Sequence, residues 1–545
     1  MTPPPKRTPW QAFWYRRRRE WVILRRYSPG QIQFWFIALV LGIVAGYAAL
    51  GFRIAVTEAQ ALFYGVDDVT SSPVAWLRVL LLPILGGLAV GIILHRFTPD
   101  GRARSVAHVI EGAALKNGRV ERRTGRASVI ASLITLSTGG STGREGPVVH
   151  LGAAISTWVS NRIRADGMTA RDLMGCAVAA AVAASFNAPI AGTIFALEVI
   201  LRHFAVHAFA PIAIASVAGA VVGRIHMGNV TEFAIPAQML GFYEELPAFM
   251  ILGLISGFVA VIMMRGIFMT EDFADRVWAR FALPGWLRPA VAGALLGLIA
   301  LKFPHIIGVG YETITEALSG KLMFWTAFSY AVIKAAAVAI TIGGRMGGGV
   351  FSPALMMGAL TGLAFGQIAT TIFPDVSGTQ TVYALAGMAA LASAVLGAPI
   401  STTLIAFELT GDWQVGIAVL VSVSLATILS SRLVSGSYFL TQLARRGVHL
   451  AQGPQAYLLS TLPVSEVMRH ATKGEHITVP DDAATITRDT TLEHAFPQLA
   501  GATGGVLYVM DGTDKDCTCV GRLSHLDALK AYNSALEQVA REEHS

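Results

Sequence analysis

The sequence predicts an all-α membrane protein with many spans, followed by a small soluble α+β region. Of its 545 residues, 53% are hydrophobic and 14% are charged, whereas about 25% of the residues in an average soluble domain are charged. Apolar runs of the roughly 20 residues needed to cross a bilayer occupy 32–51, 76–95, 207–223, 248–269 and 413–431. Other apolar runs are broken by glycine and proline, which predicts tilted, partial or re-entrant helices.

The distribution of basic residues predicts the orientation. The stretch "RRRREWVILRRY" precedes the first apolar run, and Lys and Arg in short loops favour the cytoplasmic side. We therefore expect residues 1–30 to form a basic cytoplasmic segment before an uncleaved span, with loop 95–126 on the same side. Residues 57–70 and 232–245 carry acids and almost no Lys or Arg, which places them on the opposite side. The net charge of +7 follows from this bias and gives no indication of nucleic-acid binding.

The chain contains two similar halves. The segment "CAVAAAVAASFNAPIAGTIFALE" ends at Glu198, and "AGMAALASAVLGAPISTTLIAFE" ends at Glu408. A glycine-rich turn closed by proline precedes each segment, as "GREGP" and "GGGVFSP". Duplicated halves with broken apolar segments in matching places indicate a transport site between repeats; chance similarity among tightly packed small residues is the alternative. We predict repeats at about 31–225 and 245–447.

The first turn contains Glu145, within "STGGSTGREGPVVH". A glycine-rich turn with proline at the start of a helix leaves backbone N–H groups without partners, and these donors attract an anion together with the helix dipole. The carboxylate of Glu145 is an anion on a short tether, so it can occupy the donors and then leave, or take up a proton, when an ion arrives. An ion pair with Arg144 at the membrane surface is the alternative.

The cysteines predict neither a disulfide framework nor a metal centre. Cys176 lies in an alanine-rich run, where a buried packing role is expected. Cys517 and Cys519 form a lone CxC without a second pair of ligands at zinc spacing. We expect no bound metal and no cofactor.

The rival to transport is a membrane-embedded enzyme that uses Glu145, His150 and Glu198 as metal ligands or as acid and base. Helical metal sites use ligands three or four residues apart, whereas Glu145 and His150 are five apart across a proline. His150 is either a proton relay or a packing residue. A purely structural membrane scaffold would leave the paired turns unexplained, so we expect transport and no enzymatic activity.

At these motifs the sequence resembles the CLC family of chloride channels and proton-coupled chloride antiporters. "GREGP" matches the gating-glutamate motif of that family and "GVFSP" matches its GxFxP motif, within a resemblance that runs from about residue 30 to 450. The resemblance implies an inverted repeat of tilted and partial helices. It also implies a homodimer in a bacterial inner membrane, with one chloride pathway per subunit and both termini in the cytoplasm.

The same resemblance assigns roles to individual residues. Glu145 would be the outer gate, with Arg144 and Gly146 beside it at the anion. The backbone N–H groups of Val350 and Phe351 would bind the anion. The hydroxyl of Tyr438, in "GSYFLTQLARRG", would close the pathway from the inside.

Two departures from the family pattern bear on mechanism. The stretch "ARSVAHVIEGAAL" stands where the family has a GSGIP-type turn, and the anion-contacting serine falls on Arg104 or on Ser105, depending on the alignment. Family antiporters carry a proton-accepting glutamate where this chain has Val199. An apolar residue there favours a gated channel, and a proton-coupled antiporter with Glu198 as the acceptor is the alternative.

Beyond a linker at 448–460, residues 461–545 have the composition of a soluble domain, with short β-rich runs between helical ones. The opening "VSEVM" and the closing "CVGRLSHLDALKAY" resemble a CBS module. Only about 80 residues are available, and a tandem pair of modules needs more. The resemblance therefore predicts a single or incomplete module that is cytoplasmic and pairs across the dimer. The resemblance also raises adenine-nucleotide binding, although no residue cluster argues for it.

Overall fold

The structure is a computed structural model that describes the membrane part over residues 31–65, 75–228, 244–434 and 436–448. In the C-terminal part it describes residues 462–471, 483–488, 490–511 and 518–543, together with residues 450, 459, 479 and 480. The basic segment 1–30, the loops 66–74 and 229–243, most of the linker, and Cys517 lie outside the described residues.

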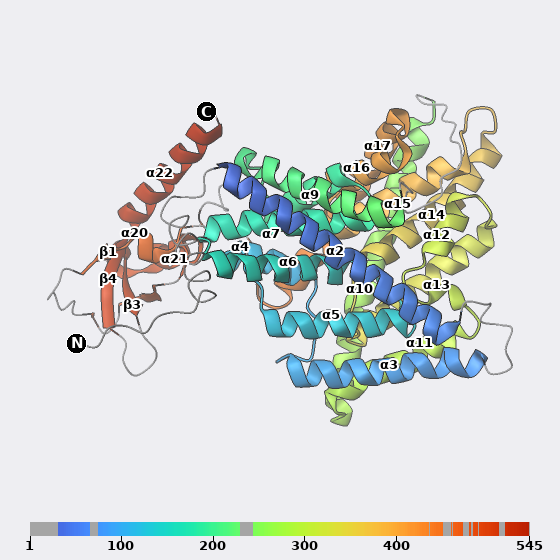
Figure 1. The fold of residues 1–545 in the computed structure, drawn as a ribbon, viewed down its shortest axis with the longest axis horizontal. Helices are drawn as coiled ribbons and strands as arrows, with labels where there is room; N and C mark the ends of the chain where they lie inside the picture. The colour runs from blue at the N-terminus through green and yellow to red at the C-terminus, as the bar shows by residue number, and fades with distance from the viewer. Residues whose placement is uncertain are drawn as a thin grey trace, which may run out of the picture.

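The first half of the membrane part contains long helices and several shorter ones (Figure 1). They are α2 (Gln31–Tyr64), α3 (Ala75–Phe97), α4 (Val106–Leu115), α5 (Arg122–Ser137), α6 (Glu145–Ile163), α7 (Gly167–Phe186), α8 (Pro189–Phe195), the π-helical turn η1 (Ala196–Leu201) and α9 (Val206–Met227). The predicted spans in this half fall within α2, α3 and α9, and each helix extends beyond its predicted span.

The second half follows the same order. Its elements are α10 (Leu246–Phe281), η2 (Gly285–Leu287), α11 (Arg288–Ala300), η3 (Pro304–Ile306), α12 (Tyr311–Leu318), α13 (Phe324–Gly343), α14 (Phe351–Ile372), α15 (Gln380–Leu396), α16 (Pro399–Thr410), α17 (Trp413–Leu433) and α18 (Tyr438–Ala444). In the first half, α7 packs against α2, α6 and α9; in the second, α15 packs against α10, α14 and α17. The recurrence of both order and packing confirms the predicted duplication.

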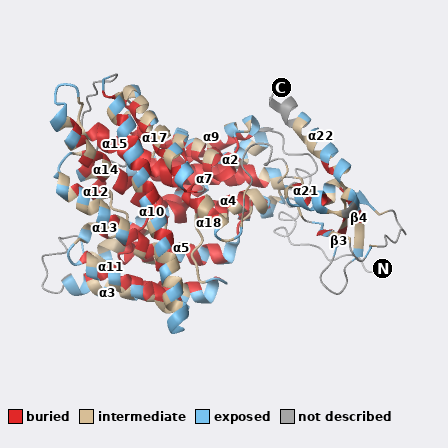
Figure 2. Ribbon diagram, turned by 180° about the vertical axis from the view of Figure 1, so that it is seen from behind, coloured by how far each residue is buried: buried red, intermediate tan, exposed pale blue. Residues whose placement is uncertain are grey.

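Within the described ranges, 8 helices are long and apolar enough to cross a membrane. Other apolar helices, such as α4 and α15, are too short to span it alone, which confirms the prediction of partial helices. Figure 2 shows the buried residues gathered along α7 and α15, which lie inside the protein rather than against lipid. These inner helices place the glycine-rich turns in a dry interior.

Small residues allow the inner helices to approach closely. A Cβ atom at Gly358 of α14 would lie 2.4 Å from the carbonyl oxygen of Gly387 in α15. A Cβ atom at Gly219 of α9 would lie 2.3 Å from the carbonyl oxygen of Ala180 in α7. Only glycine fits at such distances, as is typical of helix contacts within membranes.

The C-terminal part forms a small α+β unit at one end of the membrane part (Figure 1). Its sheet has the order β1-β4-β3-β2, with β2 parallel to β3 and the other pairs antiparallel. The elements are α20 (Val464–Val467), β1 (Arg469–His470), β2 (Thr485–Thr487), α21 (Leu492–Gly501), η4 (Thr503–Gly505), β3 (Val506–Asp511), β4 (Thr518–Ser524) and α22 (His525–Glu543). This unit has an apolar core of its own, which includes Leu492, Leu507 and Leu523. The predicted change to a soluble α+β region is confirmed.

Candidate functional site

The two glycine-rich turns meet inside the membrane part. The N–H of Gly143 donates to the carbonyl oxygen of Gly349 at 2.7 Å, and the N–H of Gly349 donates to the carbonyl oxygen of Gly143 at 2.9 Å. The Thr142 hydroxyl also donates to the Gly349 carbonyl, at 2.9 Å. A Cβ atom at Gly146 would lie 3.2 Å from the Cα of Gly349, so this close approach favours glycine. Turns from both repeats therefore form one joined structure.

The joined turns lead directly into two helices. α6 begins at Glu145 and α14 begins at Phe351. The first N–H groups of a helix have no partner within that helix, and the helix dipole adds positive potential at the same end. Two such ends held together in a buried place form a geometry suited to an anion. Gly146 and Val350, which the sequence predicts at the anion, lie here with Phe351.

The carboxylate of Glu145 is buried at this meeting point, with 4% of the residue exposed. Its Oε1 accepts a hydrogen bond from the Tyr311 hydroxyl at 2.8 Å. Its Oε2 accepts one from the Ser352 hydroxyl. The tethered anion is thus held by two hydroxyl donors, and both belong to the second repeat.

The guanidinium of Arg144 lies beside the same carboxylate. Its Nε is 4.0 Å from Oε1 of Glu145, and its Cζ stacks 4.7 Å from the centre of the Tyr311 ring. Arg144 is 6% exposed, so the pair is buried within the protein rather than exposed on its surface. Positive charge at this depth favours an anion at the helix starts.

Sequence reasoning missed Tyr311 and Ser352. Ser352 lies within the quoted motif "GVFSP", next to the predicted anion donors, so its position in the motif was a usable signal. Tyr311 opens the short helix α12 and is 166 residues away from Glu145. No local pattern in the sequence indicates that contact.

A small cavity extends from Glu145 toward the inside. It is lined by Val106, Glu145, Gly146, Val149, Val182, Phe186, Phe195, Gly349, Val350, Phe351 and Phe439. Most of these side chains are apolar, so the polar groups available to an ion are backbone N–H groups at the helix starts and the Glu145 carboxylate. Such a lining strengthens the attraction of an anion to the few donors present.

Phe439, and not Tyr438, lines the inner part of this cavity. The ring of Tyr438 stacks on Phe268 of α10, with 5.3 Å between ring centres and an angle of 11° between planes. The two residues are neighbours at the start of α18, where adjacent side chains point about 100° apart. The expectation that the Tyr438 hydroxyl closes the pathway is therefore corrected, because the ring at the cavity is that of Phe439.

Arg104 and Ser105, the two alternatives for the anion-contacting position, both lie outside the cavity lining, and the next residue, Val106, lies in it. The Ser105 hydroxyl donates to Oε1 of Gln442 in α18 at 3.2 Å. The Arg104 guanidinium is 2.9 Å from Asp100. These side chains join the start of α4 to α18 and to the loop that precedes α4.

Comparison with known proteins agrees with this geometry. The family model described as voltage gated chloride channel matches residues 86–431, which is more than half of the chain. The chain belongs to the voltage-gated chloride channel family, CLC. Among relatives of the CLC family, a putative chloride channel protein ClcB-like from Ralstonia nicotianae is 28% identical over 386 residues, which cover 70% of this chain and 89% of that protein. Chloride channel protein CLC-f from Arabidopsis thaliana is 30% identical over 434 residues, which cover 73% of this chain and 54% of that protein.

Solved CLC structures share the fold. A slow cyanobacterial Cl⁻/H⁺ antiporter superposes with a TM-score of 0.68 and 22% identity, over 76% of this chain and 97% of that one. A eukaryotic CLC transporter superposes with a TM-score of 0.66 and 18% identity, over 93% of this chain and 98% of that one. The family match and the apolar helices together show a multi-pass membrane protein of the CLC family, whose members transport chloride.

The acidic residues at the ends of the repeated segments cap each other's helices. The carboxylate of Glu198 accepts hydrogen bonds from the N–H groups of Ile400 and Ser401, at 2.9 and 2.8 Å, at the start of α16. In the other repeat, Glu408 accepts from the N–H groups of Ile190 and Ala191, at 3.0 and 2.8 Å, at the start of α8. This exchange gives Glu198 a structural role.

Val199, the position of the proton-accepting glutamate in CLC antiporters, lies in the π-helical turn η1 and is 4% exposed. Its side chain belongs to the main apolar core. The carboxylate of the adjacent Glu198 lies at the start of α16, where it accepts the hydrogen bonds described above.

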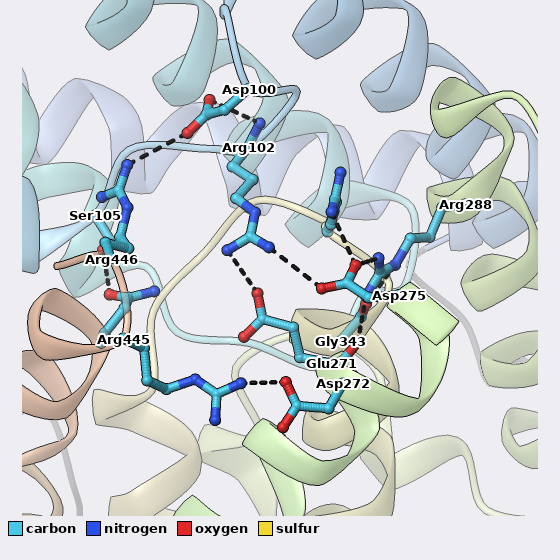
Figure 3. A network of polar contacts seen from close by, with 12 residues as sticks. Asp100, Arg102, Ser105, Glu271, Asp272, Asp275, Arg288, Gly343, Arg445 and Arg446 are labelled. Atoms are coloured by element: carbon cyan, nitrogen blue, oxygen red, sulfur yellow. Dashed lines mark hydrogen bonds and ion pairs between the residues drawn. The ribbon is translucent and has the colours of Figure 1, made fainter. Parts of the chain in front are cut away.

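A network of ion pairs surrounds the loop before α4 in this CLC chain (Figure 3). The pairs are Arg102 with Glu271 (2.8 Å) and with Asp275 (3.5 Å), Arg345 with Asp275 (2.9 Å), Arg446 with Asp100 (3.3 Å), Arg288 with Asp275, and Arg445 with Asp272. The network joins the loop before α4 to the end of α10 and to the residues that follow α18. It thereby fixes the helix that carries Phe439.

No three His, Cys, Asp or Glu side chains come together as metal ligands in the part of the chain that the structure describes. Glu145 and His150 share α6, whereas the carboxylate of Glu198 lies at the start of α16. Cys176 is buried in the middle of α7, as its alanine-rich surroundings predict.

Proposed function

We propose that this protein is a gated chloride channel in which the Glu145 carboxylate is the gate. The observation that carries the proposal is the position of this carboxylate at two joined helix starts, where it occupies the site that suits an anion. Chloride entering the site competes with the carboxylate for the same donors. Protonation of Glu145 removes its charge and so removes its advantage in that competition.

The inner end supports the same proposal. Phe439 contributes an apolar ring at the inner end of the cavity, and Val199 offers no group that can carry a proton. Both features favour passive, gated flow over obligatory exchange with protons. We assign the backbone N–H groups of Gly146, Val350 and Phe351 to chloride binding, with Arg144 supplying positive potential.

Proton-coupled chloride exchange is the second candidate. One observation favours it: His150, a residue that can carry a proton, is buried on α6 on the inner side of Glu145. In this case protons would reach Glu145 without a glutamate at position 199.

Chloride efflux from liposomes that hold the purified protein, with internal pH followed at the same time, tests both candidates. For a channel we expect chloride flux without uphill proton movement, and faster flux in Glu145→Gln, whose neutral amide cannot act as a tethered anion. Uphill proton movement driven by the chloride gradient, and lost in Glu145→Gln, would instead establish exchange. Unchanged chloride flux in Glu145→Gln would remove the gating role.

We further propose a homodimer in a bacterial inner membrane, with both termini cytoplasmic. The helices that carry the reciprocal caps and their neighbours expose a broad apolar face. This face includes Ile190 (54% exposed), Val217 (52%), Val221 (46%), Ile400 (46%), Leu420 (46%) and Ile428 (56%). We propose that a second copy covers it, and that the CBS-like regions pair in that dimer. The mass of the detergent-solubilised protein, measured by light scattering, tests the dimer.

A further inference from the structure

His150 is a buried imidazole that the proposed gate mechanism does not use. Its residue exposure is 1%. Neither ring nitrogen has a hydrogen-bond partner among the described residues. A buried polar group left without a partner costs about 1–3 kcal/mol, and such groups point to a bound water or ion, or to a functional role.

The ring occupies a place that a neighbouring helix leaves open. A Cβ atom at Gly125 of α5 would lie 2.6 Å from Nε2 of His150, so any larger residue at that position would displace the ring. On the α4 side, the ring lies near the charge of the Arg104 guanidinium, and it makes a backbone contact with Ser105 that falls short of hydrogen-bond geometry. The His108 imidazole also lies near the ring.

Other charged groups on the surrounding helices face elsewhere. On α5, the side chains of Arg122, Arg123 and Arg126 are exposed. On α7, Asp172 lies 3.6 Å from His207. Also on α7, the buried Arg171 donates to the carbonyl oxygen of Ala113 at 2.8 Å. An apolar cluster between α6, α2 and α7 includes Ala49, Phe52, Val56, Val148, Ala181 and Ala184. The polar surroundings of the ring are therefore those of the inner mouth.

His150 lies between the gate and the cytoplasmic side. It follows Glu145 by five residues on α6, a rise of about 7.5 Å. α6 continues to a turn where the Arg119 guanidinium donates to the carbonyl oxygen of Ala165 at 2.7 Å, and Arg119 belongs to the basic loop expected in the cytoplasm. Ser105 and His108, on the same side, are half-buried, so water reaches this end.

We propose that His150 carries protons between the cytoplasmic mouth and the Glu145 carboxylate, and that it thereby sets the response of the gate to internal pH. The inference rests on the proposed role of Glu145 as the gate. The bare nitrogen of the neutral ring takes one proton from water at the inner mouth. The other nitrogen gives up its proton, through water, to the carboxylate, which becomes a neutral acid.

The ring ends neutral in its other tautomer and returns to the first when it turns over or when the transfer runs backward. One proton enters and one leaves in each transfer. The Arg104 cation disfavours a lasting imidazolium, so the charged ring is short-lived. Chloride in the cavity lowers the energy of the His150 imidazolium, which links proton delivery to the presence of chloride.

The test is chloride efflux from liposomes in which external pH is fixed and internal pH is varied. In the wild-type protein we expect the rate to rise severalfold as internal pH falls from about 7.5 to about 5.5, because protons reach the neutral ring more often as their concentration at the inner mouth rises. In His150→Gln this internal response is lost, while the response to external pH is retained. The matched control is His305→Gln. Both ring nitrogens of His305 also lack a partner among the described residues, but its ring stacks 3.5 Å from that of Tyr330, and we expect a wild-type response.

A second variant covers the case in which His150→Gln fails to fold. Gly125→Ala leaves the imidazole in the chain and displaces it, and we expect it to weaken the internal pH response. An unchanged internal response in His150→Gln, or none in the wild-type protein, would overturn the relay. Failure of the gate proposal can be told apart from failure of the relay, because it appears as an unchanged chloride rate in Glu145→Gln. If the wild-type protein moves protons against the chloride gradient, His150→Gln should slow that proton flux and leave the chloride flux in place.

Discussion

The hydroxyl of Tyr311 donates a hydrogen bond of 2.8 Å to Oε1 of Glu145, and so it joins the second repeat to the first. Ser352, also in the second repeat, donates to the other oxygen of the same carboxylate. The proposed gate is thus a shared structure, with its carboxylate on α6 and the two donors on α12 and α14. If Glu145 is the gate, its closed position depends on both halves of the chain.

Tyr311→Phe should make the gate easier to open. A hydrogen bond to a charged group contributes roughly 1.5–3 kcal/mol, so its loss is expected to shift the balance toward the open state by about tenfold or more. Chloride efflux at neutral pH measures the change. Tyr330→Phe is the control, since the Tyr330 ring stacks on His305 away from Glu145. Equal rates in Tyr311→Phe and wild type would show that this bond does not hold the gate.

Phe439 should restrict the inner end of the pathway. Phe439→Ala removes the ring that lines the cavity, and we expect faster chloride efflux together with weaker discrimination between chloride and larger anions. Tyr438→Phe removes only a hydroxyl from a ring stacked on Phe268, so we expect a rate within about twofold of wild type, as for a change of less than about 0.5 kcal/mol. A large change of rate in Tyr438→Phe and none in Phe439→Ala would instead indicate that Tyr438 closes the inner end.

The reciprocal caps should matter for stability. Glu198→Gln removes a charge-assisted cap from the start of α16, and Glu408→Gln removes the matching cap from α8. Each is expected to lower the free energy of unfolding by about 1–2 kcal/mol, which thermal unfolding in detergent measures. Ser401→Ala, which removes only a hydroxyl that bonds Glu198 at 2.8 Å, should cost less. A changed internal pH response of transport in Glu198→Gln would contradict the structural role and favour a role as proton acceptor.

Asp275 should be the more important of two neighbouring acids at the inner mouth. It pairs with Arg102, Arg288 and Arg345, and the side chain of Arg288 is only 2% exposed. Because Asp275→Asn leaves a buried cation without its carboxylate, we expect a loss of about 2 kcal/mol, moderated by the partial exposure of Asp275. Asp272→Asn affects only a partly exposed pair with Arg445 and should cost at most about 1 kcal/mol. Similar melting temperatures for both variants would contradict this ranking.

The C-terminal region should lose stability in acid through Asp527. Hydrogen bonds from the Arg469 guanidinium and the Ser524 hydroxyl hold the pKa of the Asp527 carboxyl below its ordinary value. A carboxyl whose pKa is lower in the folded state stabilises that state at neutral pH, and the stabilisation is lost as the pH falls through the folded pKa. Hydrogen exchange of β4 and α22 in the full-length protein should therefore speed up in acid. In Asp527→Asn it should be faster at neutral pH and less sensitive to acid. Equal sensitivity in both proteins would contradict this account.

Much of the fold could be predicted because it follows from simple periodic features. Long apolar runs predicted α2, α3, α9, α10 and α17. The duplicated motifs predicted that the two glycine-rich turns belong to equivalent places. Helix starts carry free donors whatever their sequence, so Glu145 could be placed at an anion site without knowledge of its neighbours.

The contacts that were missed depend on tertiary packing. Tyr311 lies far along the chain, and only the folded protein brings its hydroxyl to Glu145. Phe439 and Tyr438 are adjacent aromatics, and the rotation of α18 decides which one reaches the cavity. The matching positions of Glu198 and Glu408 indicated equivalent roles, but the exchange of caps between the halves required the packing of α8 against α16.

The paired backbone bonds between Gly143 and Gly349 make the frame of the pathway stiff. A transporter that works by rocking one half against the other would have to break or strain this link in each cycle. In the proposed mechanism the moving part is one side chain of a few atoms, whose rotation belongs to a much faster class of motion than the microsecond-to-millisecond displacement of domains. That mechanism therefore predicts that the rate at which one carboxylate and one ion exchange places limits ion throughput.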